Sequence, residues 1–180
     1  MKLLGIFTTF ILLTSCQDLR KDKQIQSVDK LATEVETIQK EYLDKKNDTI
    51  GRLIPLVMDV EFRIRRNFVS DTIAKVLGVK INAYKQVRKR VKPLGKMYVQ
   101  LDKGTKEELE TLKKLKSDIE SDLGEHAKYQ EYINFEKKKV GQLAMVLEQM
   151  IIDQNYCIET FNKYHQELND FSWTLIKNKK

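Results

Sequence analysis

The sequence predicts an all-α protein, an elongated antiparallel helical bundle or coiled coil of three to four helices with a long C-terminal helix. Its 180 residues include only 7 Gly and 2 Pro among many Lys, Glu, Leu and Ile, a composition typical of long helices. Beyond residue 20, apolar side chains recur at spacings of three and four residues, as on one face of a helix. In the C-terminal half they also recur every seven residues, which implies left-handed coiled-coil packing. We expect one helical domain over residues 22–177.

The first helix is predicted over about residues 22–47. Its apolar positions follow the four-three spacing that places side chains on one stripe. These positions are Val28, Leu31, Val35, Ile38 and Tyr42. Capping side chains at 47–49, followed by Gly51, predict a turn after this helix.

The second segment, about residues 52–102, carries two apolar registers. The first is the seam Leu53, Val57, Val60 and Ile64. The second differs by one residue and contains Ile73, Leu77, Tyr84, Val87, Val91, Leu94, Tyr98 and Leu101. A break near 68–71 would explain the shift, so the segment is either one helix or two. Pro55 is tolerated if it falls in the first turn, and Pro93 is expected to bend the later part.

The stretch LDKGTKEEL predicts the next turn. Gly104 can take the left-handed conformation after a helix end, and Thr105 with Glu108 matches a capping box. We therefore expect one helix to end near Asp102 and the C-terminal helix to span about 105–176. One heptad position of that helix holds Leu112, Ile119, Ile133, Val140, Leu147, Phe161, Leu168 and Leu175, and its companion holds Leu143, Met150, Cys157, Tyr164 and Phe171.

The C-terminal heptad frame contains two polar residues and passes one candidate hinge without a skip. Gly124 is a candidate hinge, whereas His126 and Gln154 place polar side chains in the heptad position. A polar seam residue can fix the register or serve a ligand. The simpler interpretation is a histidine near solvent and a glutamine that hydrogen-bonds to a neighbouring helix.

Residues 1–15 have the organisation of an export leader. Lys2 gives a basic start, and the apolar stretch Leu3–Leu13 suits a secretory leader but is too short to span a bilayer. The ending LTSC, residues 13–16, resembles the lipobox of bacterial lipoproteins, in which an aliphatic residue and two small residues precede an invariant cysteine. The alternatives are an ordinary secretory leader and a buried N-terminal helix.

The lipobox resemblance implies where the protein resides. Cys16 would be the first residue of the mature chain, with a diacylglycerol on its thiol and an acyl chain on its amino group, and residues 16–21 would form a tether. Several acyl chains anchor a protein stably, because each buried CH₂ contributes about 0.8 kcal/mol. The resemblance thus implies a lipid-anchored protein of the cell envelope, periplasmic or surface-facing. Gln17, in place of an Asp that resembles an inner-membrane retention signal, favours the outer membrane.

Cys157 is the only thiol left in the mature chain if Cys16 is lipidated. No intramolecular disulfide can then form, and the fold depends on packing. Because Cys157 lies on the apolar seam, a small buried hydrophobe is a simpler role for it than a reactive or dimer-forming thiol.

The sequence lacks the motifs of common catalytic and metal sites. It has no nucleotide-binding loop, HExxH or GxSxG, motifs that mark such sites. It also lacks the Glu-x-x-His pairs of di-iron bundles, because Leu123 and Asn162 stand three residues before the two histidines. Two histidines and one mature cysteine argue against a zinc site. We predict a protein that is not an enzyme and that uses no cofactor and no metal.

Outward-facing cations form the candidate binding surface. The chain carries 33 Lys and Arg against 26 Asp and Glu, a net charge of +7. The candidate set is Arg63, Arg65, Arg66, Lys85, Arg88, Lys89, Lys92 and Lys96. These cations could attract phosphate groups of lipids or envelope glycans, and the alternative is a solvated face without a ligand. An exported lipoprotein rarely meets nucleic acid, so no such partner is predicted.

Two functional hypotheses remain. The first is a non-catalytic interaction or structural module for a protein partner or envelope polymer, which needs an exposed apolar stripe or an uncovered stretch of the long helix. The second is a module that binds a small molecule or an anionic lipid, which needs a cavity with convergent polar groups. Because the first two helices are too short to cover the C-terminal helix, we also predict self-association into a homo-oligomer.

Overall fold

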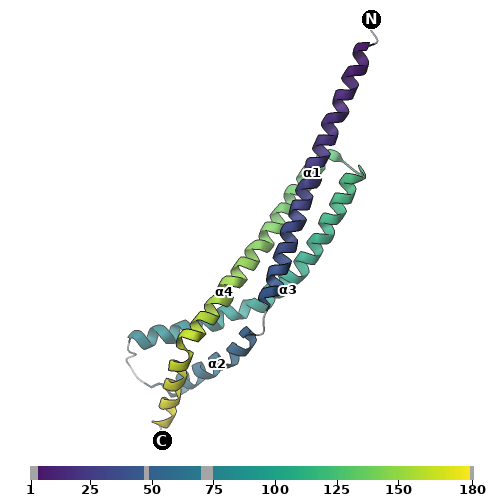
Figure 1. Ribbon diagram of the computed structural model, residues 1–180. Coiled ribbons are helices and arrows are strands. Elements are labelled where there is room, and N and C mark those ends of the chain that lie inside the picture. The colour runs from purple at the N-terminus through teal and green to yellow at the C-terminus, as the bar shows by residue number, and fades with distance from the viewer. Residues whose placement is uncertain (1–3, 47–48, 70–74, 179–180) are drawn as a thin grey trace. The chain divides into compact units, whose positions relative to one another are not determined.

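The chain is all-α, as the sequence predicts. A computed structural model describes the backbone of residues 4–46, 49–69 and 75–178, and the side chains in these ranges apart from residues 4–18 and His126. The four helices of the bundle are α1 (Leu4–Lys45), α2 (Thr49–Asn67), α3 (Lys75–Glu120) and α4 (Tyr129–Lys177), and a short 3₁₀ turn, η1 (His126–Lys128), precedes α4 (Figure 1). No strand occurs in these ranges. None of the described helices is long and apolar enough to cross a membrane.

The two N-terminal helix boundaries agree with the sequence pattern. α1 ends at Lys45 and α2 begins at Thr49, so the end of the first helix is confirmed; residues 47 and 48 of the predicted turn lie outside the described part of the chain, and Gly51 belongs to α2. α2 ends at Asn67 and α3 begins at Lys75, so the register shift near 68–71 marks a break between two helices. Residues 70–74, which include Ile73 of the predicted seam, lie outside the described part of the chain.

The turn predicted at Gly104 is wrong, because α3 runs unbroken from Lys75 to Glu120. Thr105 and Glu108 are 0% and 2% exposed, and they continue the three-four spacing of the buried α3 positions. The Thr105 hydroxyl donates to the carbonyl of Leu101, one turn earlier in the same helix (2.7 Å). The apparent capping box is therefore part of the core.

The chain reverses at residues 121–128 instead. Gly124 has a φ of +96°, in the left-handed region that glycine enters with little strain. The amide of Leu123 donates to the carbonyl of Asp118 (2.9 Å) and closes the end of α3. The candidate hinge at Gly124 is thus a full reversal, and the last helix is α4, with 49 residues, rather than a helix over 105–176.

The first of two compact units consists of residues 1–41 and 101–145. Within it α1 is antiparallel to α3, since Lys21 donates to the Glu120 carbonyl and Lys116 to the Asp29 carboxylate. Its buried apolar side chains are Val28, Leu31, Val35, Ile38, Leu101, Leu112, Leu115, Ile119, Tyr129, Ile133, Val140 and Leu143. All except Leu115 and Tyr129 are predicted seam positions.

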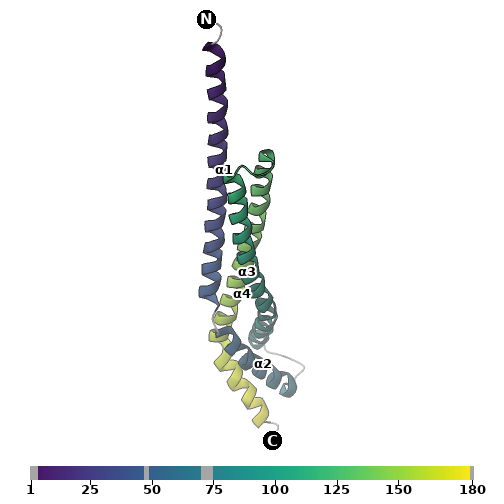
Figure 2. The same ribbon diagram turned by 90° about the vertical axis from the view of Figure 1, so that its right-hand side faces the viewer.

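The second unit consists of residues 42–100 and 146–180 and contains all of α2. In both views α2 lies beside the C-terminal part of α4, as Figure 2 shows from the side. The buried apolar side chains of this unit are Tyr42, Ile50, Val57, Val60, Ile64, Tyr84, Val87, Leu94, Leu147, Met150, Cys157 and Leu168.

Gln154 and Cys157, two seam residues of the second unit, both contact groups on neighbouring helices. The Gln154 side-chain amide donates to the Lys45 carbonyl (3.1 Å) and to the Tyr98 hydroxyl, which confirms the predicted hydrogen bond to a neighbouring helix. The Cys157 thiol contacts the Val87 carbonyl (3.8 Å), and burial raises the pKa of this thiol to about 11. A thiol with so high a pKa is unreactive near neutral pH.

The corrected position of the C-terminal helix removes the argument for self-association. The sequence predicts self-association through an uncovered part of a helix over 105–176, which the structure does not contain. Residues 105–120 belong to α3, and Thr105, Glu108 and Leu112 are buried in the first unit. Self-association stays a prediction, as does a single domain over 22–177.

Candidate functional site

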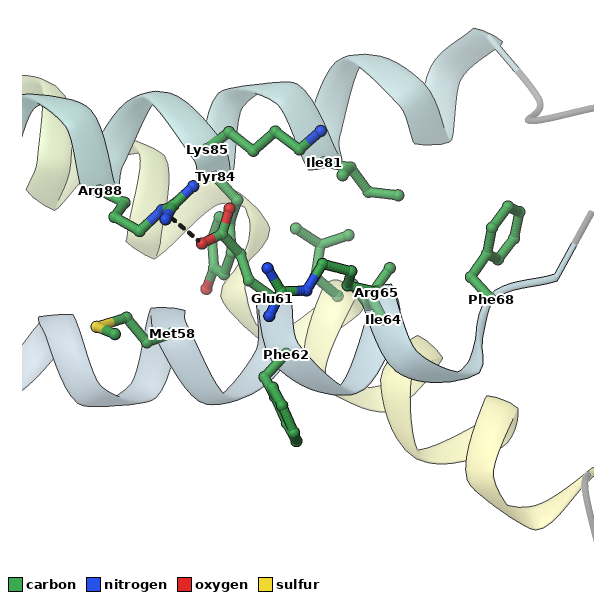
Figure 3. A pocket seen from close by; sticks show the side chains of 11 residues that line it. Met58, Glu61, Phe62, Ile64, Arg65, Phe68, Ile81, Tyr84, Lys85 and Arg88 are labelled. Atoms are coloured by element: carbon green, nitrogen blue, oxygen red, sulfur yellow. Dashed lines mark ion pairs between the residues drawn. The ribbon is translucent and has the colours of Figure 1, made fainter.

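A pocket of about 490 Å³ lies between α2 and α3 in the second unit, with one lining residue from α4 (Figure 3). Its volume is in the range of small-molecule sites. The lining consists of Met58, Glu61, Phe62, Ile64, Arg65, Phe68, Ile81, Tyr84, Lys85, Arg88 and Leu168.

Helical spacing explains why these side chains meet. Residues four and then three positions apart lie on one face of a helix. In α2 and just beyond its end, this spacing aligns Glu61, Arg65 and Phe68, and in α3 it aligns Ile81, Lys85 and Arg88. The two sets line the pocket from opposite sides.

The inner part of the pocket is apolar. Ile64 and Leu168 are 5% and 0% exposed, so they belong to the core and also line the pocket. Phe68 follows the end of α2 and Ile81 lies in the first two turns of α3, so they line the pocket from its two sides (Figure 3). The Phe68 ring packs against Phe171 of α4 with the centroids 5.9 Å apart. These surfaces can accept an apolar group of a ligand.

The mouth of the pocket carries an excess of positive charge. Arg88 Nε of α3 lies 3.3 Å from Glu61 Oε2 of α2, and this ion pair connects the two sides (Figure 3). Glu61 is the more buried partner, with a side chain that is 17% exposed. Arg65 and Lys85 have no ion-pair or hydrogen-bond partner among the described residues. Two cations are therefore available to an anionic ligand.

A neutral pair supports the wall of the pocket. The Tyr84 hydroxyl lies 2.6 Å from His165 Nδ1 of α4, and Phe161 stacks on the imidazole with the ring centroids 4.2 Å apart. Burial, followed by the charge of Glu61, raises the pKa of Tyr84. Burial, followed by the charge of Arg63, lowers the pKa of His165. Both side chains are thus uncharged near neutral pH, and the charge of the pocket comes from its acidic and basic residues.

Three of the eight predicted cations line the pocket, namely Arg65, Lys85 and Arg88. Lys89, Lys92 and Lys96 are exposed on α3 but do not line it. The structure thus brings part of the predicted surface together around a cavity and leaves these lysines on the solvated face.

Two further members of the predicted set make other contacts. The Arg63 guanidinium donates to Asn169 (2.6 Å) and Ser172 (2.9 Å) of α4 and lies 4.5 Å from the centroid of Trp173. Its contacts connect α2 to α4. Arg66 lies over Phe62 of its own helix, 5.9 Å from the ring centroid.

Glu61 is not among the site residues predicted from the sequence, although its carboxylate lowers the positive charge of the site. α2 holds two acids, Asp59 and Glu61, among its arginines. They are the available signal, because a carboxylate in a basic segment pairs with one of the cations. Phe68 and Ile81 were also missed, and they lie outside the two apolar seams.

The proposed lipidation residue, Cys16, lies in the part of α1 whose side chains the structure does not describe. In the described part of the chain, no group of three or more His, Cys, Asp or Glu could hold a metal ion. No protein-family model matches the chain, and neither a curated protein nor a solved structure is significantly similar to it.

Proposed function

We propose that the protein is a lipid-anchored cell-envelope module whose second unit binds an anionic amphiphile, a small molecule with an acidic head and one apolar chain. One observation carries the proposal: the same pocket combines an apolar interior with two cations at its mouth that pair with no described residue. Burial of an apolar chain contributes about 25 cal/mol per Å², and cations at the rim orient the acidic head.

The proposal favours the second of the two functional hypotheses drawn from the sequence. A binding module requires a cavity with convergent polar groups, and Arg65, Lys85 and Arg88 converge on this one. The lipobox resemblance at Cys16 supports the envelope location, where amphiphiles are abundant. The acidic head and apolar tail make separate contributions, so they can be tested separately.

Calorimetric titration with three compounds tests the proposal. The protein is the full chain with Cys16→Ser, which carries no acyl chain of its own that could enter the pocket. Octyl phosphate below its micelle concentration is expected to bind at one saturable site. Octanol, which lacks the acidic head, and inorganic phosphate, which lacks the tail, are each expected to bind at least about tenfold more weakly, since each loses one contribution.

A pair of lysine variants locates the site. Lys85→Gln removes a cation of the pocket that pairs with no described residue, and it is expected to weaken octyl phosphate binding about twofold to fivefold, the effect of an exposed charge. Lys92→Gln removes an exposed cation of the same helix outside the pocket and is expected to change binding little. Equal loss in both variants, or no saturable binding by the parent chain, contradicts the proposal.

An exposed apolar stripe favours an interaction module as a second candidate function. Met58, Phe62 and Val69 are 50%, 49% and 84% exposed. Met58 and Phe62 also line the pocket, although the Phe62 ring points away from α3 (Figure 3). Crosslinking in the native cell envelope tests this candidate. A partner that is captured by the parent chain and by Lys85→Gln, but not by Val69→Gln, would support a docking surface separate from the pocket, because Val69 does not line it.

A further inference from the structure

We infer that the pocket prefers a phosphomonoester head group, which carries two negative charges, over a head group with a single charge. This inference rests on the proposed function and specifies its ligand. It depends on the arrangement of the charged side chains at the mouth of the pocket.

The pocket has a positive net charge, which the carboxylate of Glu61 lowers by one. Three cations and one carboxylate line it, which leaves a net charge of +2. Because Glu61 pairs with Arg88 at 3.3 Å, the uncompensated charge is that of Arg65 and Lys85. The attraction of an anion to this charge grows in proportion to its own charge, so a dianion gains about twice as much as a monoanion.

The unpaired cations also come from different helices. Arg65 belongs to α2 and Lys85 to α3, on opposite sides of the pocket. A phosphomonoester offers three terminal oxygens that accept hydrogen bonds. It can therefore accept from both cations at once while the ion pair of Glu61 and Arg88 stays intact.

Octyl sulfate provides a control of matched shape. It has a tetrahedral head on the same chain but carries one charge at all accessible pH values, whereas the second pKa of a phosphomonoester is near 6. At pH 7.5 octyl phosphate is expected to bind about tenfold more tightly than octyl sulfate to the full chain with Cys16→Ser. At pH 5 the two affinities are expected to become similar, because the phosphate then also carries one charge.

The ratio of the affinities for octyl phosphate and octyl sulfate distinguishes ionisation of the ligand from ionisation of the protein. The charged and titratable groups around the site are Glu61 and Arg65 from α2, Tyr84, Lys85 and Arg88 from α3, and His165 from α4. A change in the charge of any of them acts equally on two monoanions, so ionisation of the protein alone does not move the ratio away from one. The ratio of the two affinities at each pH therefore reports the second charge of the phosphate.

A Glu61→Gln variant tests the role of the carboxylate. Removal of its charge raises the net charge of the pocket and frees Arg88, so the preference for octyl phosphate over octyl sulfate at pH 7.5 is expected to increase about threefold. Arg65→Gln is expected to reduce this preference, and Lys89→Gln, outside the pocket, is expected to leave it unchanged.

The possible results separate the inference from the proposed function. Equal binding of the two ligands at pH 7.5, or a ratio that does not change with pH, would overturn the inference and leave an amphiphile site. A failure of both ligands to bind would overturn both. The primary comparison uses one protein and two ligands, so it does not depend on the folding of any pocket variant.

Discussion

At the scale of single residues, an unusual feature of the first unit is a charged cluster in its core. Glu108 of α3 is 2% exposed, and Lys139 Nζ of α4 lies 2.6 Å from its Oε2 and 2.7 Å from Glu136 Oε2. Glu108 Oε1 has no hydrogen-bond partner among the residues that the structure describes. Burial, with a contribution from nearby Glu136, raises the pKa of Glu108. One ammonium group therefore compensates two carboxyl groups.

Removal of Lys139 should destabilise the fold more than removal of its neighbour. Lys139→Met leaves the Glu108 carboxylate without its ion-pair partner, and we expect a loss of about 1–3 kcal/mol in the free energy of unfolding at pH 7. Lys138→Met removes an exposed cation of the same helix and is expected to change stability by less than about 0.5 kcal/mol. Urea denaturation of both variants measures the difference, and equal stabilities would contradict the assigned role of Lys139.

The pH dependence of the Lys139→Met effect has a defined sign. Because the pKa of Glu108 is raised in the fold, its contribution to stability is fully present below the unfolded value, near 4.3, and is lost as the pH rises through the folded value. Above that value the carboxylate depends on Lys139. The destabilisation by Lys139→Met is therefore expected to shrink when the pH is lowered from 7 to 5. A destabilisation that stays constant over this range would show that Glu108 does not take up a proton there.

At the scale of helices, heptad spacing predicts which residues are buried but does not locate the turns. Ile119 and Ile133 stand fourteen residues apart, so the heptad frame continues across a reversal of the chain. Thr105 and Glu108 fit both a capping box and two consecutive core positions of a continuous helix. The second interpretation agrees with the unbroken three-four spacing from Tyr84 onward, which was the available signal.

The sequence pattern of a single helix does not predict the pocket. The outward direction of Arg65, Lys85 and Arg88 follows from the inward direction of the apolar residues, so these cations could be predicted. The cavity requires the separation of α2 and α3 and the pairing of Glu61 with Arg88 across it. The helix separation and the ion pair both depend on how α2 and α3 pack. The periodic spacing of apolar residues in each helix predicts neither of them.

Two glycines of the C-terminal half should respond to alanine in opposite ways. Gly124 has a φ of +96°, which strains an alanine, so Gly124→Ala is expected to lower the free energy of unfolding by about 1–2 kcal/mol. Gly141 lies within α4, and a Cβ there meets nothing within 4 Å, so Gly141→Ala is expected to raise it by about 1 kcal/mol. Urea denaturation measures both effects. A stabilising Gly124→Ala would contradict the reversal at 121–128.

At the scale of the whole molecule, the proposed anchor and the proposed ligand both contain an apolar chain. The lipobox resemblance implies acyl chains on Cys16, and the pocket suits an apolar chain with an acidic head. A protein held at a membrane by acyl chains remains where amphiphiles are concentrated, which raises the occupancy of a weak site by mass action. The anchor and the pocket are nevertheless separate predictions, because neither requires the other in order to form.

The two cysteines of the chain allow a matched test of the anchor. Mass spectrometry of the protein purified from bacterial membranes is expected to find an N-terminal peptide that begins at Cys16 and carries fatty acyl mass. Cys16→Ser removes the thiol that accepts the lipid, so this variant is expected to lack the acyl mass. Cys157→Ser is expected to retain it, because the Cys157 thiol is buried within the second unit. An unmodified Cys16 in the parent protein would contradict the lipid anchor and leave the amphiphile pocket to be judged by its own titrations.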